Sequence, residues 1–277
     1  MKSAFLLPFI GPLPSYFPFW AKSCEINADA FHWFVYSDQT DALAHVNPAV
    51  TIIPYRVEEI VKDFKEFVGI QIDGGNLRML CNFRLLFYFL RRDREPLHQF
   101  GFIGYTDMDM IYGRLSRYLP DNMEQYAMVS ADRARPCGPF TLIRTDRVET
   151  LSANDAVRKA MTMDVHRPFD ESEEFLHIVA GGDQFWSQPD PLQPAMTWSF
   201  NHRKMFSVWE KGNVTVYDNR GHKRTGGFHH FSRYKDRPTF RILGSPEQDR
   251  KWAVCKKGIF PLRSTRDWLR LWLTLII

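Results

Sequence analysis

The chain has 277 residues, of which 44% are hydrophobic and 25% are charged, with both signs of charge mixed along it. This composition excludes a disordered or low-complexity chain, because enough apolar side chains are present to offset the entropy lost on folding. The net charge of +4 conceals an asymmetry, since residues 219–277 hold 14 Lys and Arg against 4 Asp and Glu, and their net +10 leaves −6 for residues 1–218. A basic C-terminal region indicates an anionic partner: nucleic acid, a membrane surface or the phosphates of a small ligand.

The start of the chain and its cysteines point to a cytosolic setting. The apolar run at residues 4–10 is broken by Gly11-Pro12 and has no small-x-small cleavage site after it, so it predicts a buried strand rather than a signal peptide. The four cysteines form no Cys-x-x-Cys pair, which argues against zinc-ribbon and disulfide-scaffold proteins. No stretch approaches the ~20 apolar residues that span a bilayer.

Hydrophobic periodicity predicts an α/β protein. Apolar segments at 4–10 and 31–36 are expected to form strands, with a helix at 14–27 between them. Further helices are expected at 57–68, 76–92, 111–119 and 147–163, and further strands at 100–105, 127–130 and 139–144. The C-terminal part is expected to contain a hairpin at 206–217, an irregular Gly-rich basic segment at 221–231 and a helix at 263–277.

An Asp-x-Asp motif, Asp107-Met108-Asp109, directly follows the strand expected at 100–105. Strand alternation would send both carboxylates to one side while Met108 turns away. Mg²⁺ or Mn²⁺ binds through one or two such carboxylates and takes its remaining ligands from phosphates and water. The motif therefore predicts a divalent metal site, although a lone Asp-x-Asp on a surface loop usually binds no metal.

The basic segment at 227–235 (GFHHFSRYK) carries the complementary chemistry. A neutral imidazole can complete the coordination of Mn²⁺, and a nearby Lys or Arg can neutralise a diphosphate. On its own the segment would be interpreted as a basic surface loop with two incidental histidines. Together with the Asp-x-Asp motif it supplies what a metal-bound diphosphate requires.

At this point the sequence resembles a family of glycosyltransferases with the GT-A fold, many of them bacterial and viral proteins of surface-glycan synthesis. Five stretches carry the resemblance: FLLPFIGPLPSYFPFWAKSCEINADAFHWFVYSDQ (5–39), LCNFRLLF (80–87), FGFIGYTDMDMIYGRL (100–115), GPFTLIR (138–144) and FHHFSRYK (228–235). The third is the most specific and is similar to the family's Phe-Trp-Gly-Tyr-x-Asp-x-Asp-x-x-Gly. The chain departs from the family at Met79, Asn82 and Ile103, where the family usually has Lys, Asp and Trp.

The resemblance implies a GT-A type fold, a Rossmann-like nucleotide-binding sheet flanked by helices, over residues 1–240, with a C-terminal extension at 241–277. It implies that Asp107, Asp109 and His230 bind Mn²⁺ or Mg²⁺. The remaining donor contacts that it implies are Phe9, Gly11 and Asp38 beside the base and ribose, Asp107 near the ribose, Arg84 as a phosphate-directed or structural cation, and Lys235 on the diphosphate.

Glycosyl transfer also needs a base for the acceptor hydroxyl, and in inverting enzymes this is usually a carboxylate across the sugar from the diphosphate. The candidates are Asp170, Glu171 and Asp183, and the resemblance favours Glu171. Each of these could equally be a solvated loop carboxylate. The predicted activity is transfer of a sugar, with inversion favoured, from a nucleoside-diphosphate sugar to a hydroxyl of a glycan or lipid-linked acceptor in cell-surface polysaccharide synthesis.

Two other functions remain open. A nucleotide-sugar or glycan-binding protein without catalysis would keep the same residues, and Asn82 is the feature that suggests it. A nucleic-acid-binding protein would use the basic tail, but the tail lacks aromatic residues interleaved for stacking and a recognition helix, so no nucleic acid is expected as partner.

The segment at 263–277 mixes three arginines and two tryptophans with leucines and isoleucines. It could lie in a membrane interface beside anionic headgroups, as a peripheral contact on the inner face of a membrane. Alternatively it is a terminal helix that docks on the protein's own core.

Overall fold

The computed structural model describes residues 1–39, 45–69, 71–72, 74, 80, 84–131, 136–151, 171–180, 185–187, 206–217, 222–231 and 235–276. The chain divides into two compact units. The first unit comprises Met1–Leu13, Ala28–Asp107 and Pro120–Pro189, and the second comprises Pro14–Asn27, Met108–Leu119 and Asp190–Ile277. The chain therefore passes from one unit to the other inside the Asp-x-Asp motif, between Asp107 and Met108.

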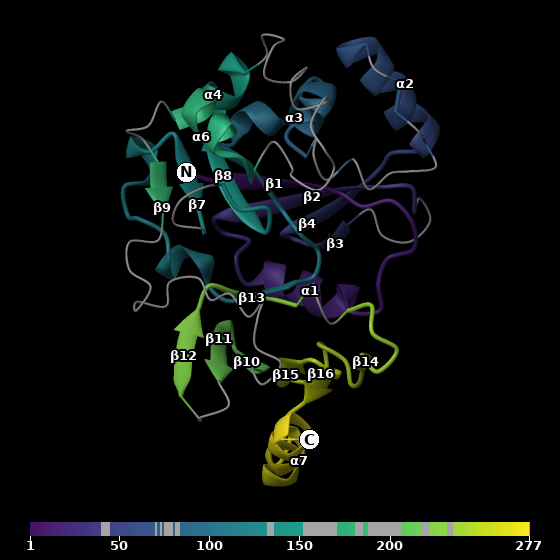
Figure 1. The fold of residues 1–277 in the computed structure, drawn as a ribbon, viewed down its shortest axis with the longest axis vertical. Helices are drawn as coiled ribbons and strands as arrows, with labels where there is room; N and C mark the ends of the chain where they lie inside the picture. Colours follow the sequence, from purple (N-terminus) through teal and green to yellow (C-terminus); the bar gives the residue numbers. More distant parts are fainter. Residues whose placement is uncertain are drawn as a thin grey trace. The chain divides into compact units, whose positions relative to one another are not determined.

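Within the described residues, the first unit is built on an eight-stranded mixed sheet of order β3-β4-β2-β1-β5-β8-β7-β9 (Figure 1). The bounds are β1 Ser3–Pro8, β2 Phe31–Ser37, β3 His45–Asn47, β4 Val50–Pro54, β5 Phe102–Thr106, β7 Met128–Ser130, β8 Phe140–Arg144 and β9 Phe185–Ser187. β1 lies between β2 and β5 and pairs with both in parallel, and β4 continues the parallel set beyond β2. β5 and β8 pair antiparallel. The expected α/β class with parallel strands is confirmed.

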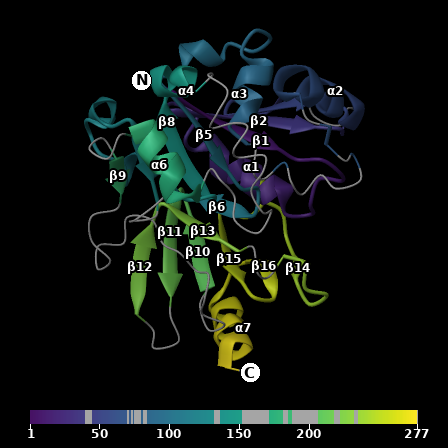
Figure 2. The same ribbon diagram turned by 45° about the horizontal axis from the view of Figure 1, so that its top comes forward.

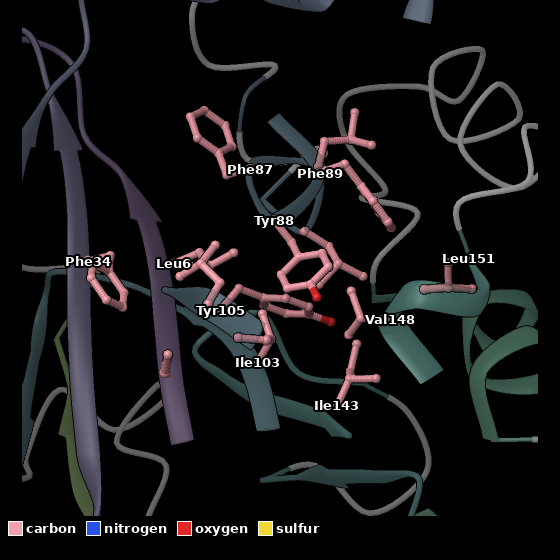
Figure 3. Packing of buried hydrophobic residues seen from close by; sticks show 14 of the residues in the cluster. Leu6, Phe34, Phe87, Tyr88, Phe89, Ile103, Tyr105, Ile143, Val148 and Leu151 are labelled. Atoms are coloured by element: carbon pink, nitrogen blue, oxygen red, sulfur yellow. The ribbon is translucent and has the colours of Figure 1, made fainter. Parts of the chain in front are cut away.

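One face of this sheet is covered by helices of the same unit. They are α2 Val57–Val68, α3 Leu86–Arg91, α4 Thr145–Thr150 and α6 Glu173–Ala180, and a short 3-10 turn, η2, spans Leu97–Gln99. Their apolar side chains meet alternate strand residues, such as Leu6, Ile103 and Ile143, in one buried cluster (Figure 3). Phe5 points to the opposite face, where its ring stacks on Trp33 at 5.4 Å between centroids. This alternation follows from the two-residue period of a strand.

Two of the helices expected in this unit differ from the structure. Arg84 and Leu85 lie in a turn and α3 begins only at Leu86, so the continuous helix expected at 76–92 is wrong. The apolar stripe identified the buried face, but a periodic stripe does not mark where a helix starts. α4 spans Thr145–Thr150, and residues 152–163 of the helix expected at 147–163 lie outside the described residues. α2 begins and ends where it was expected.

The second unit contains α1 Phe17–Glu25 and a two-stranded sheet of β6 Met110–Tyr112 and β13 Phe228–His230. Side chains in the last turn of α1 and just after it bind the end of β6 and the residues that follow. The Tyr112 amide donates to Ser23 Oγ at 3.0 Å, the Asn27 side chain donates to the Gly113 carbonyl, and the Leu115 amide donates to Asn27 Oδ1. A 3-10 turn, η3 Leu115–Arg117, follows, whereas the next one, η4 Met123–Gln125, belongs to the first unit. The helix expected at 111–119 is therefore wrong, because β6 pairs with a strand more than 110 residues later and a local pattern cannot show such a partner.

The described second unit also contains a six-stranded sheet of order β12-β11-β10-β15-β16-β14 (Figure 2). The bounds are β10 Phe206–Glu210, β11 Asn213–Tyr217, β12 Lys223–Gly226, β14 Arg241–Ile242, β15 Lys251–Cys255 and β16 Gly258–Pro261. The expected hairpin at 206–217 is confirmed; Lys211 and Gly212, at its turn, both have positive φ, as a two-residue hairpin turn requires. The segment at 221–231 is not irregular, since β12 and β13 lie in it.

The C-terminal helix, α7 Thr265–Ile276, packs on the sheet of its own unit. The Phe206 ring meets Trp268 and Trp272 edge-on, with centroid distances of 6.3 and 5.3 Å. Among the described residues no helix combines the length and apolarity needed to cross a membrane. The division into residues 1–240 and an extension at 241–277 stays a prediction, and β14, β15 and β16 pair within the same sheet as β10.

Candidate functional site

The carboxyl ends of β1 and β2 are joined through Asp38. The Gly11 amide donates to Asp38 Oδ1 at 2.8 Å, and the Phe9 amide donates to the Tyr36 carbonyl at 2.8 Å. Gly11 has φ +100°, a conformation that strains other residues. Asp38 thus fixes the turn after β1, at the sheet edge where α/β proteins bind ligands. Contact of Phe9, Gly11 and Asp38 with a base and ribose stays a prediction.

The first unit contains a buried cation that holds two carboxylates. The Arg84 side chain is 5% exposed, and its Nη1 lies 3.2 Å from Asp107 Oδ1 while its Nη2 lies 2.9 Å from Glu171 Oε1. Nη1 also donates to the Gly138 carbonyl at 2.9 Å, and the guanidinium lies 4.5 Å from the centre of the Tyr105 ring. Because each acceptor occupies a defined direction of the planar fork, Arg84 fixes Asp107 and Glu171 relative to one another.

Glycine at position 138 is a requirement of this cluster. A Cβ there would overlap the Glu171 carboxylate and lie 3.1 Å from Arg84 Nη2. Glu171 stands just before α6 and is partly exposed. Of the other candidate bases, Asp170 and Asp183 lie outside the described residues. The contact between Arg84 and Glu171 was not anticipated, and the GPF motif at 138–140 was the signal that could have identified the close approach at Gly138.

The second unit contains a buried carboxylate with two basic partners. The antiparallel pairing of β6 with β13 sets His230 opposite Met110, and the Phe231 amide donates to the Asp109 carbonyl at 3.0 Å. This register brings His230 Nε2 to 3.1 Å from Asp109 Oδ1, while Lys235 Nζ lies 2.8 Å from Asp109 Oδ2. Asp109 is 3% exposed. Three residues expected to act together are therefore in contact, and Arg233, beside them in the sequence, lies outside the described residues.

The basic partners keep Asp109 ionised although it is buried. Burial opposes ionisation, but the hydrogen bond from His230 and the charges of His230 and Lys235 outweigh it and lower the pKa of Asp109 to about 2. The neighbouring His229 alternates away from this group along β13 and is fully buried. Burial, assisted by the charge of His230, lowers the pKa of His229 to about 3, so His229 is neutral at physiological pH.

The Asp-x-Asp motif covalently connects the group around Arg84, through Asp107, with the group around Asp109. Asp107 is joined to Asp109 through Met108 alone, so their Cα atoms are at most about 7 Å apart. Asp107, Asp109 and His230 form the one group of potential metal ligands found among the residues that the structure describes. Two carboxylates and an imidazole are hard-oxygen and nitrogen donors of the kind that Mn²⁺ and Mg²⁺ accept, with the imidazole favouring Mn²⁺.

The comparisons with known proteins place the chain in a family. A family model described as "Family of unknown function (DUF6625)" matches residues 5–257, so the chain belongs to that family. No curated protein matches the chain.

Among solved structures, the glycosyltransferase GlyE of Streptococcus pneumoniae TIGR4 is similar to 68% of this chain, at a TM-score of 0.39 and 13% sequence identity. The matched region spans 45% of the length of that protein. A similarity of this extent does not by itself assign a fold family or an activity to the present chain.

Proposed function

We propose that this member of the DUF6625 family is a metal-dependent glycosyltransferase of the GT-A type. It moves a sugar from a nucleoside-diphosphate donor to a hydroxyl of a glycan or lipid-linked acceptor, with a role in cell-surface polysaccharide synthesis. The observation that carries the proposal is the environment of Asp109: a buried, ionised carboxylate between an imidazole and an ammonium, two residues after a second carboxylate.

The donor set fits a divalent cation. Asp109 is ionised at every physiological pH, so it binds a cation without first losing a proton. Asp107 adds a partly exposed carboxylate, and His230 adds a ring nitrogen. These ligands are too few to enclose an ion, which leaves coordination positions for phosphate oxygens and water. A bound Mn²⁺ or Mg²⁺ would supply neutralisation of the negative charge that develops on the departing diphosphate.

Lys235 is suited to hold the diphosphate itself. Its side chain is partly exposed while the carboxylate that it contacts is buried, so its ammonium can reach a ligand at the surface of the group. An ammonium at that point favours the diphosphate more strongly as charge accumulates on it during bond cleavage. Arg84, which is almost fully buried, keeps Asp107 in place rather than contacting the donor directly.

Glu171 is the base that we assign to the acceptor. A carboxylate oxygen of Glu171 takes the proton of the acceptor hydroxyl as that oxygen bonds to the anomeric carbon, while the bond from that carbon to the diphosphate breaks. Arg84 donates to Oε1, which leaves Oε2 of the partly exposed side chain for the acceptor. Attack opposite the leaving group inverts the anomeric configuration, and we propose an inverting reaction.

The described sheet of the first unit supports a nucleotide site at its carboxyl edge. β1 and β2 run parallel and end beside one another, and the turn after β1 is held by Asp38. In α/β sheets this edge is where nucleotides bind. Phe9, Gly11 and Asp38 are the residues that we propose for the base and ribose.

A donor screen tests the proposal. Purified protein is incubated with a panel of nucleoside-diphosphate sugars and Mn²⁺ or Mg²⁺, and release of the nucleoside diphosphate is measured. We expect release with at least one donor, abolished by a chelator and reduced more than about a hundredfold in Asp109→Ala. Asp249→Ala is the matched control, because it removes another buried carboxylate of the same unit, paired with Arg263, that has no proposed part in the site.

The same screen separates catalysis from binding alone. If a donor binds in the presence of metal and no nucleotide is released with any acceptor, the chain is a nucleotide-sugar-binding protein and the enzyme proposal is wrong. If no donor binds and none is cleaved, the protein neither transfers a sugar from the donors tested nor binds them.

A further inference from the structure

The exposed face of α7 combines leucines with arginines. Leu269 and Leu273 are 61% and 50% exposed, which places them among the most exposed large apolar residues in the described part of the chain. Arg266 and Arg270 are exposed as well. The spacing 266, 269, 270, 273 is that of neighbours on one helical face, so the four side chains form a single strip, which we call the α7 strip.

The opposite face of α7 packs against the sheet of its own unit. Leu271 is buried in the cluster formed with Phe206, Val208 and Leu262, and Trp268 and Trp272 pack against that cluster. Lys251 Nζ also lies 5.3 Å from the centre of the Trp268 ring. Because these contacts fix the rotation of the helix on its sheet, the α7 strip is directed away from the core of its own unit.

The helix is anchored at its first turn, which makes the strip a stable surface. The Asp267 carboxylate accepts hydrogen bonds from the backbone amides of Arg263 and Ser264, each at 2.9 Å. Ser264 Oγ accepts in turn from the Asp267 amide at 3.3 Å, which completes a reciprocal cap. Asp267 is the one acidic residue between 250 and 277, where seven Lys and Arg occur, and its carboxylate serves the cap.

We infer that the α7 strip binds the surface of an anionic lipid bilayer. A bilayer interface offers anionic headgroups to Arg266 and Arg270 and, a few ångströms deeper, an apolar layer to Leu269 and Leu273. Nucleic acid would satisfy the arginines but not the leucines, and an apolar protein groove would leave two guanidinium groups unpaired. In the proposed attachment α7 lies along the bilayer surface, with its opposite face on the sheet of its own unit.

Flotation with vesicles tests the inference on the full-length protein. The vesicles contain either phosphatidylglycerol mixed with phosphatidylcholine or phosphatidylcholine alone. We expect the wild type to float with the anionic vesicles and to lose this binding on addition of salt. Leu269→Ser/Leu273→Ser should weaken the partition coefficient about tenfold. Arg266→Gln/Arg270→Gln should weaken it about 25-fold, at about fivefold for each arginine.

Two control variants are matched to these changes within the same unit. Leu243→Ser removes a leucine that is 48% exposed but lies outside α7. Lys223→Gln/Arg224→Gln removes two exposed cations on β12. Both controls should float like the wild type, and all variants should keep its melting temperature because only exposed side chains change.

Three results would overturn the inference: equal flotation with neutral vesicles, no flotation of the wild type with anionic vesicles, or α7 variants that float as well as the controls. The assay contains no donor and no metal, so its failure and the failure of the proposed glycosyl transfer are independent observations.

Discussion

Lys235 and Asp109 are in direct contact, with 2.8 Å between Nζ and Oδ2. The carboxylate is buried and the ammonium is partly exposed. Lys235 therefore balances part of the negative charge of Asp109. Under the proposed function, a divalent cation would balance that charge instead. Asp109 also belongs to the one group of potential metal ligands among the described residues.

Replacing Lys235 should affect metal and nucleotide in opposite directions. In Lys235→Met a cation no longer competes for the Asp109 carboxylate, so Mn²⁺ should bind about tenfold more tightly than in the wild type. A nucleoside diphosphate should bind less tightly, because its phosphates lose an ammonium. Calorimetric titration of each ligand measures both changes. Weaker binding of both would show that Lys235 acts only as a structural partner of Asp109.

Stability should fall in acid through Asp109. Its pKa in the folded protein is about 2, below the ordinary value of 3.8, so as the pH falls the unfolded chain takes up this proton first. The ionised carboxylate stabilises the fold fully above about pH 4 and loses its contribution, on the order of 2 kcal/mol, as the pH approaches about 2. Denaturant unfolding of the wild type and of Asp109→Asn across this pH range measures this contribution. The unfolding free energy of the variant should depend less on pH than that of the wild type. Parallel curves would refute the assignment.

Arg84 should be far more important for stability than Arg144, an arginine whose side chain is 24% exposed. In Arg84→Met, two carboxylates and the Gly138 carbonyl lose their shared donor, which should cost about 3 to 5 kcal/mol of unfolding free energy. Arg144→Met removes an ion pair with the exposed Asp146 and one hydrogen bond to the Glu124 carbonyl, and it should cost no more than about 1 to 2 kcal/mol. Urea unfolding of both variants provides the comparison, and similar losses would contradict the burial argument.

A methyl group at position 138 should disturb the same cluster from another side. The Cβ of Gly138→Ala overlaps the Glu171 carboxylate, so the contact between Glu171 and Arg84 should be displaced, at a cost of about 1 to 3 kcal/mol. Gly74→Ala is the matched control, because its Cβ would meet Val57 Cγ1 at an ordinary 3.4 Å. Thermal unfolding of the two variants should give a lower melting temperature for the first and little change for the second.

Glu171 should affect turnover and leave metal binding unchanged. Glu171→Gln keeps the acceptor for Arg84 but cannot take a proton, so kcat should fall about a hundredfold to ten-thousandfold. Mn²⁺ affinity should stay as in the wild type, since Glu171 does not belong to the ligand group. A loss of metal binding, or an unchanged kcat, would remove Glu171 as the base and direct attention to Asp170 and Asp183.

Local sequence pattern predicted the elements whose formation depends on near neighbours. The continuous apolar segments at 4–10 and 31–36 identified β1 and β2, and the apolar period identified α2 over Val57–Val68. The hairpin at 206–217 could be predicted because its two strands are joined by a two-residue turn and pair with one another. The segment at 111–119 was predicted wrongly, since β6 is a strand only through its pairing with β13. The strand β13 in the segment 221–231 was missed for the same reason, and β12 in that segment extends the hairpin by pairing with β11.

The residue types of the candidate site were likewise present in the sequence: two carboxylates at a spacing of two, and histidines and a lysine in a basic segment far away. Sequence alone thus determined that this protein carries the residue types from which the proposed metal and diphosphate site is built. Only the tertiary structure decided that Asp109 is buried and ionised between His230 and Lys235, and that Arg84 couples Asp107 to Glu171. The reason is physical: ionisation and hydrogen-bond geometry depend on which groups exclude water from one another, and that is set by contacts between distant parts of the chain.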